Sequence, residues 1–191
     1  MNLPNKLTIL RIVLTFIFML FIFSRGLIFK IFALLIFSLA SLTDFYDGHI
    51  ARKRSLVTNF GKIMDPIADK LLVIGALLAF VQLHIISAWM VVLIISREMI
   101  ITSLRFFAMT KGKFLQAEKG GKHKTVSQMV AIFLILGYLI FKEVMVHFFI
   151  WTDNVEFWCR IGIFVTMLIT VALTLISGIS YLWQNRNLIH D

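Results

Sequence analysis

Six long runs of mostly apolar residues occupy most of this chain, and their length limits what it can fold into. A helix that crosses the hydrocarbon core of a bilayer needs about 20 mainly apolar residues. The backbone polar groups of such a segment must be satisfied within it, which favours helices throughout. We therefore expect an all-α, polytopic membrane protein with six transmembrane helices in a single domain, residues 1–191. The expected spans are residues 8–23, 27–47, 61–82, 85–108, 126–150 and 157–184.

The scarcity of charged side chains supports lipid as the solvent for much of this surface. Hydrophobic residues make up 60% of the chain and charged residues only 15%, whereas a soluble domain carries about 25% charged residues. A single cysteine, Cys159, excludes an intramolecular disulfide and any site built from several cysteines. These features exclude an ordinary soluble domain and a disulfide-rich secreted one.

The basic residues indicate how the chain is oriented. An even number of spans places both termini on one side, and 15 of the 19 Lys and Arg fall on that side. Because cytoplasmic segments carry the excess of Lys and Arg, we expect both termini and residues 48–60 and 109–125 in the cytoplasm. This predicts a multi-pass protein of the inner (cytoplasmic) membrane. The net charge of +9 then reflects topology, and we expect no nucleic-acid partner. The four basic residues on the opposite side are Arg25, Lys30, Lys142 and Arg160.

Four of the ten acidic residues lie close together at the facing ends of two expected spans. Asp44 and Asp47 are three residues apart, and Asp65 and Asp69 are four apart. On a helix each pair would share one face, about one turn apart. Oxygen ligands favour Mg²⁺ or Mn²⁺, and two such ions suit phosphoryl chemistry. The pattern predicts a site for two divalent metal ions; the alternative is four separate helix caps and solvated loop acids.

Small residues and one arginine accompany these acids. Gly48, Ala51 and Gly61 would let a bulky ligand approach the backbone. Arg52 can bridge phosphate oxygens with two hydrogen bonds. Its alternative role is a charge that only anchors the topology.

The spacing of these residues resembles the signature of the CDP-alcohol phosphatidyltransferase family. The resemblance implies the family fold, a homodimer, and transfer of a phosphatidyl group from CDP-diacylglycerol to an alcohol with release of CMP. It implies that Asp44, Asp47, Asp65 and Asp69 hold the metal ions and that Asp69 is also the general base. It further implies that Gly48, Ala51, Arg52 and Gly61 contact the CDP-lipid. The matching pattern is Asp44-x2-Asp47-Gly48-x2-Ala51-Arg52-x8-Gly61-x3-Asp65-x3-Asp69.

A softer resemblance concerns the acceptor alcohol. Three further stretches are similar to bacterial phosphatidylglycerophosphate synthases, which implies sn-glycerol 3-phosphate as the acceptor. These stretches are Asn2-Leu3-Pro4-Asn5-x-Leu7-Thr8-x2-Arg11, then Arg97-Glu98 with Thr102 and Arg105, and Gly121-Lys122-x-Lys124-Thr125-x2-Gln128-Met129.

The charges in these stretches suit a dianionic acceptor. Arg97 and Glu98 lie within an apolar span, where ionisable residues are costly and usually functional. Arg105 lies two turns nearer the cytoplasm, and Lys124 lies at the entry of the next span; we expect Arg97, Arg105 and Lys124 to face the acceptor phosphate. Alternatively, Arg97 pairs with an acid on another helix, and Lys124 only sets the topology. Thr8 and Asn5 are expected at the nucleotide, or else as a helix cap.

Other functions remain open at this stage. The same chemistry could use phosphatidylglycerol, giving cardiolipin, or inositol phosphate or serine. A divalent-cation transporter with an acidic mouth is the alternative from another class. Transporters tend to bind near the bilayer midplane, whereas these acids gather at one side. A noncatalytic scaffold would have no use for four matched acids.

Overall fold

A computed structural model describes residues 3–54, 59–111, 120–148 and 151–186, and within these ranges all regular structure is helical. Side chains are described except at residues 3–6, 44–66, 69 and 120–123. The prediction of an all-α, six-helix architecture is confirmed for this part of the chain. The helices are α1 (Leu3–Phe23), α2 (Leu27–Arg54), α3 (Asn59–Gln82), α4 (Ala88–Thr110), α5 (Gly120–Phe148) and α6 (Asp153–Gln184).

Several helices extend beyond the predicted apolar spans. α1 starts at Leu3 rather than at residue 8, and α2 continues to Arg54 rather than ending at residue 47. α5 begins at Gly120, six residues before its predicted start. The apolar run measures only the part of a helix that suits lipid, and polar residues can continue the same helix beyond it. The eight specified residues of the signature therefore lie on helical backbone, in α2 and α3.

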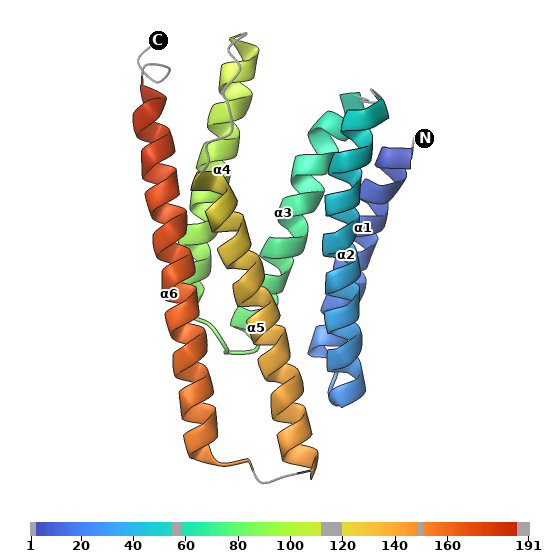
Figure 1. Ribbon diagram of the computed structural model, residues 1–191, viewed down its shortest axis with the longest axis vertical. Coiled ribbons are helices and arrows are strands. Elements are labelled where there is room, and N and C mark those ends of the chain that lie inside the picture. Colours follow the sequence, from blue (N-terminus) through green and yellow to red (C-terminus); the bar gives the residue numbers. More distant parts are fainter. Residues whose placement is uncertain (1–2, 55–58, 112–119, 149–150, 187–191) are drawn as a thin grey trace.

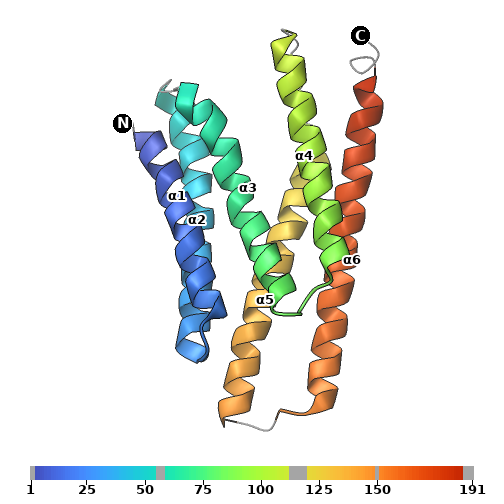
Figure 2. The same cartoon turned by 180° about the vertical axis from the view of Figure 1, so that it is seen from behind.

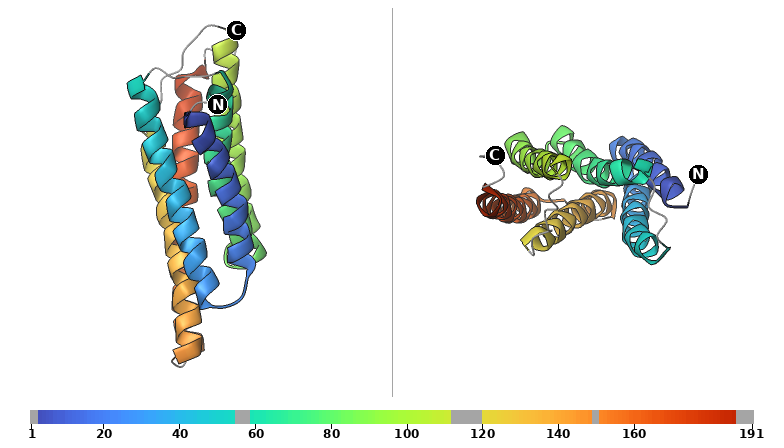
Figure 3. Two further views of the ribbon diagram at one scale, coloured as in Figure 1. Left: turned by 90° about the vertical axis from the view of Figure 1, so that its right-hand side faces the viewer. Right: turned by 90° about the horizontal axis from the view of Figure 1, so that it is seen from above.

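The helices form two rows of three. Seen from above, α4, α3 and α1 make one row, and α6, α5 and α2 make the other (Figure 3). Short turns join α1 to α2 and α3 to α4; Gly26 in the first turn has φ +108°, which favours glycine. Both chain ends, the facing ends of α2 and α3, and the end of α4 lie at one end of the bundle (Figures 1 and 2).

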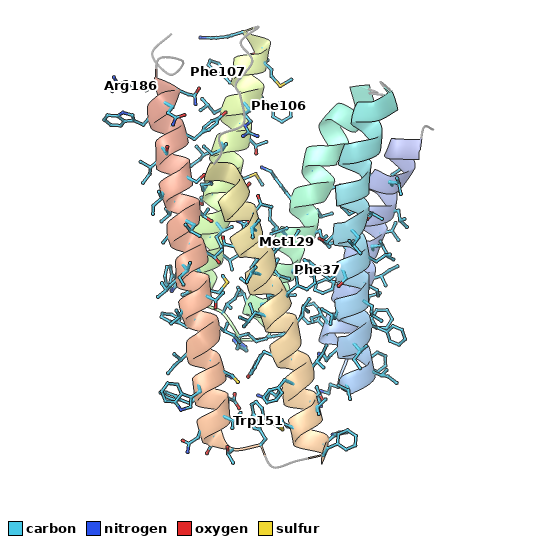
Figure 4. The ribbon with its side chains drawn as sticks, in the orientation of Figure 1. Phe37, Phe106, Phe107, Met129, Trp151 and Arg186 are labelled. Atoms are coloured by element: carbon cyan, nitrogen blue, oxygen red, sulfur yellow. The ribbon has the colours of Figure 1, made fainter. Side chains whose placement is uncertain are left out.

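Aromatic side chains fill the centre between the rows. Phe37 of α2 is fully buried and points between α2 and α5, on the side where Met129 lies (Figure 4). Its ring centroid lies 5.5 Å from that of Phe18 on α1 and 5.4 Å from that of Phe133 on α5. These contacts connect three helices through one side chain.

Polarity is distributed as expected for a protein in lipid. Large apolar side chains such as Leu20 and Phe148 are about 70% exposed, whereas Thr8, Lys124 and Ser177 are buried between helices. An outer surface this apolar requires a nonaqueous environment. Among the described residues, Lys124–Phe148 and Asp153–Gln184 are long and apolar enough to cross a membrane. α4 carries Arg97, Glu98 and Arg105 within its length, which lowers its hydropathy.

Candidate active site

The signature residues occupy two helix ends that lie side by side at one end of the bundle (Figure 1). The continuous helix of α2 places Asp44 and Asp47 one turn apart, and that of α3 does the same for Asp65 and Asp69. Gly48, Ala51 and Arg52 lie on α2, and Gly61 on α3. The side chains of all eight residues, and of Asn5, lie outside the described residues. Among the side chains that are described, no group of three His, Cys, Asp or Glu could hold a metal ion.

The chemistry of this acidic set fits divalent cations. If the four carboxylates converge at a membrane boundary they would repel and lose hydration, and two divalent ions would balance their charge. Asp44, Asp47, Asp65 and Asp69 are therefore candidates to hold such ions.

A cluster of charges surrounds Glu98 of α4 and includes side chains from α3 and α5. The ammonium of Lys70 lies 3.5 Å from Glu98 Oε2 and donates to the Glu98 carbonyl oxygen at 3.1 Å. It also donates to the hydroxyl of Thr102. Lys124 of α5 donates directly to Glu98 Oε1, and Arg97 NH1 lies 3.4 Å from the same oxygen. One carboxylate thus connects cations from three helices.

This cluster is largely withdrawn from solvent. The side chains of Lys124, Arg97 and Glu98 are only 8%, 10% and 13% exposed. At this depth an unpaired charge would be costly. Glu98 is therefore the counterion of three basic side chains inside an apolar bundle.

The two arginines of α4 also contact α6. Arg97 NH2 donates to Ser177 Oγ at 2.9 Å, and its aliphatic stem lies over Gly178. Arg105 Nε donates to the hydroxyl of Tyr181 at 3.3 Å, and its guanidinium carbon lies 5.3 Å from the centre of the ring. Within the described structure the buried Nε of Arg97 has no hydrogen-bond partner.

The structure bears on several of the alternatives left by the sequence. Arg97 and Lys124 are brought together through Glu98, and Arg105 lies two turns further along α4. The acid that Arg97 contacts is its own neighbour and not, as the alternative had it, an acid on another helix. Lys124 is buried and paired with Glu98, which favours a role beyond topology. Thr8 is buried within α1, five residues after Leu3, and does not cap that helix.

The sequence analysis did not identify four residues that contact this cluster or Arg105. They are Lys70, Ser177, Gly178 and Tyr181. Lys70 was counted only as a topology charge, although it directly follows Asp69. Ser177, Gly178 and Tyr181 sit in the last apolar span and carry no charge. The sequence did carry a signal for a helix contact. Ser177 and Gly178 are two small residues followed by Tyr181 within an apolar helix, and such residues often face a neighbouring helix.

Comparison with known proteins defines the class. The sequence profile of CDP-alcohol phosphatidyltransferase matches residues 1–185. As the signature predicted, the chain belongs to the CDP-alcohol phosphatidyltransferase family. The enzymes of this family are known to use divalent metal ions.

Relatives within the family are more specific. The chain is 39% identical to the CDP-diacylglycerol–glycerol-3-phosphate 3-phosphatidyltransferase of Bacillus subtilis, over 96% of this chain and 95% of that one. It is also 39% identical to the enzyme of the same name from Rickettsia typhi, over 94% of both chains. A probable phosphatidylglycerophosphate synthase from Mycobacterium tuberculosis is 41% identical over 71% of this chain and 66% of its own length.

Loss of the Glu98 charge should destabilise the bundle. We expect Glu98→Gln to lower stability by about 3–5 kcal/mol, because cations of three helices lose their buried partner. The measurement is thermal unfolding of the purified protein in detergent. Glu98→Gln/Lys124→Met should recover part of the loss, since it also removes one of the unpaired cations.

The control is Glu156→Gln, which makes the same change at the other end of the bundle. Glu156 also contacts basic side chains, Lys142 and Arg160, but in a more exposed setting. Its replacement should cost less than that of Glu98. Equal melting temperatures for Glu98→Gln and the parent would contradict the central place of this carboxylate.

Proposed function

We propose that this protein transfers the phosphatidyl group of CDP-diacylglycerol to sn-glycerol 3-phosphate, giving phosphatidylglycerophosphate and CMP. The observation that carries the acceptor assignment is the charge of the cluster on α3, α4 and α5. Among the described side chains, Glu98 is paired with three cations, Lys70, Arg97 and Lys124, which leaves a formal net charge of +2. Arg105, two turns further along α4, adds a fourth cation on the same helix. Glycerol 3-phosphate is a dianion near neutral pH, so its pocket needs an excess of positive charge. The names of the relatives support the same acceptor.

The acidic helix ends would carry the chemistry. In our proposal Asp44, Asp47, Asp65 and Asp69 hold two divalent ions, Mg²⁺ or Mn²⁺. When bound, such ions neutralise phosphate charge and stabilise the departing CMP. Asp69 takes the proton of the acceptor hydroxyl, whose oxygen attacks the β-phosphorus of the CDP-lipid. The new P–O bond joins the phosphatidyl group to glycerol 3-phosphate as the bond to CMP breaks.

Substrate positions follow from this assignment. Gly48, Ala51, Arg52 and Gly61 would receive the CDP moiety, with Thr8 and Asn5 near the nucleotide. Arg97, Arg105 and Lys124 would bind the acceptor phosphate. Lys70 directly follows Asp69 on α3 and bonds to α4, which supports a short path between base and acceptor site.

The remaining assignments concern the membrane location, the topology and the oligomeric state. We propose a single domain over residues 1–191 in the inner (cytoplasmic) membrane, with the termini and the active site on the cytoplasmic side and a homodimer as the assembly. The start of α1, the facing ends of α2 and α3, and the ends of α4 and α6 lie at one end of the bundle (Figure 1). This arrangement supports placing all of these helix ends on the same side of the membrane. The lysine and arginine bias supports the cytoplasm as that side.

An acceptor panel tests the proposed reaction. Purified protein with labelled CDP-diacylglycerol and Mg²⁺ or Mn²⁺ should release CMP and form labelled lipid product only when glycerol 3-phosphate is added. We expect no product above background with phosphatidylglycerol, inositol phosphate or serine. The second set of motifs resembles enzymes whose acceptor is glycerol 3-phosphate and not one of these alcohols. Efficient turnover of serine, or of any other acceptor in place of glycerol 3-phosphate, would rule out the acceptor assignment.

The role of Asp69 can be separated from substrate binding. Asp69→Asn should lower transfer by at least about a hundredfold, because the general base is lost, while some binding of CDP-diacylglycerol is retained. Product formation and lipid binding are measured on the same membranes. Asp153→Asn, at an exposed position at the start of α6, is the matched control and should behave as the parent. Transfer by Asp69→Asn at the parental rate would show that another group is the base.

A further inference from the structure

We propose that Ser177, Gly178 and Tyr181 of α6 are positioning residues that hold Arg97 and Arg105 for the acceptor phosphate. This inference rests on the proposed function, since it assigns α6 a role in that same acceptor site. Ser177 and Tyr181 are four residues apart and so lie on one face of the helix, one turn from each other. All three residues are buried.

Gly178 provides the space in which Arg97 lies. A Cβ atom at position 178 would stand 2.8 Å from Arg97 Cγ and 3.3 Å from its Nε. Cγ belongs to the stem of the side chain, close to the backbone, so it cannot yield as a flexible tip would. Any residue larger than glycine must therefore shift the arginine or separate α4 from α6.

Ser177 fixes the direction of the Arg97 guanidinium. The serine hydroxyl accepts from NH2 at 2.9 Å, and Glu98 Oε1 lies 3.4 Å from NH1. The guanidinium is thus held from α6 and from its own helix, and its side chain is 10% exposed. A planar group restrained at both terminal nitrogens has little rotational freedom, which lowers the entropic cost of binding an anion.

Tyr181 restrains the second arginine in a complementary way. Its hydroxyl accepts from Arg105 Nε at 3.3 Å, and the guanidinium carbon lies 5.3 Å from the ring centre. Tyr181 is 2% exposed, whereas Arg105 is exposed. The bond occupies Nε and so leaves the two terminal nitrogens for a bidentate contact with phosphate.

These residues could instead serve only to pack α4 against α6. The two roles differ in what a substitution changes. A packing role predicts a loss of stability and a similar effect on both substrates. A positioning role predicts a higher KM for the acceptor while the KM for CDP-diacylglycerol stays constant, because binding of only one substrate is impaired.

The experiment compares Gly178→Ala with Gly162→Ala on the same helix. A Cβ at Gly162 meets nothing within 4 Å, so this control makes the same chemical change in open space. We expect Gly178→Ala to raise the KM for glycerol 3-phosphate about tenfold or more, with the KM for CDP-diacylglycerol unchanged. Gly162→Ala should match the parent in both values.

Tyr181→Phe provides a second variant that adds no volume, in case Gly178→Ala fails to fold. It removes only the bond to Arg105 and should raise the same KM by about three- to tenfold, with an unchanged melting temperature. Parental KM values in both variants would overturn the inference, as would equal rises for both substrates accompanied by a lower melting temperature. If the parent itself does not transfer to glycerol 3-phosphate, the proposed function fails instead, and the two failures are distinguishable.

Discussion

The carboxylate of Glu98 is the interaction on which the rest of this structure depends. It lies inside an apolar bundle and is shared by Lys70 of α3, Arg97 of α4 and Lys124 of α5. Burying basic groups at this depth without a counterion would be costly. Because the partners come from three helices, the same carboxylate also ties both rows of the bundle together. The cluster still carries an excess of positive charge, and this excess is what makes an anionic acceptor chemically reasonable.

α3 connects this cluster to the acidic signature. Asp69 and Lys70 are consecutive residues, so one turn of α3 carries both the proposed base and a cation that bonds to α4. The bundle brings the facing ends of α2 and α3 to the same end as both termini (Figure 1). Lys70 therefore links the helix that carries the proposed metal ligands to Glu98 and Thr102 of α4, beside the proposed acceptor site. α6 completes the arrangement by supporting the two arginines of α4 from outside the charged cluster.

The sequence predicted the broad architecture because it is dictated by local signals. Apolar length identified six helices, and the spacing of the four aspartates identified the family. Helix bounds were less accurate, since polar residues continue α1, α2 and α5 beyond their apolar runs. The partners of Arg97 and Arg105 could not be predicted, because Ser177, Gly178 and Tyr181 lie about 80 residues away and their contacts depend on how α4 packs on α6. Spacing within one helix can indicate a face that packs on a neighbouring helix, but it does not identify the side chain that this face contacts.

Equilibrium binding of labelled glycerol 3-phosphate to the purified protein in detergent tests the central claim most directly, because it needs no turnover and isolates the positive cluster. The account predicts saturable binding that uncharged glycerol does not displace, and an affinity about tenfold or more weaker for Arg105→Gln. Arg186→Gln should bind as the parent does, since Arg186 lies against Trp183 near the end of α6 and outside the cluster (Figure 4). Absence of saturable binding, or equal affinity in the parent and Arg105→Gln, would contradict the account.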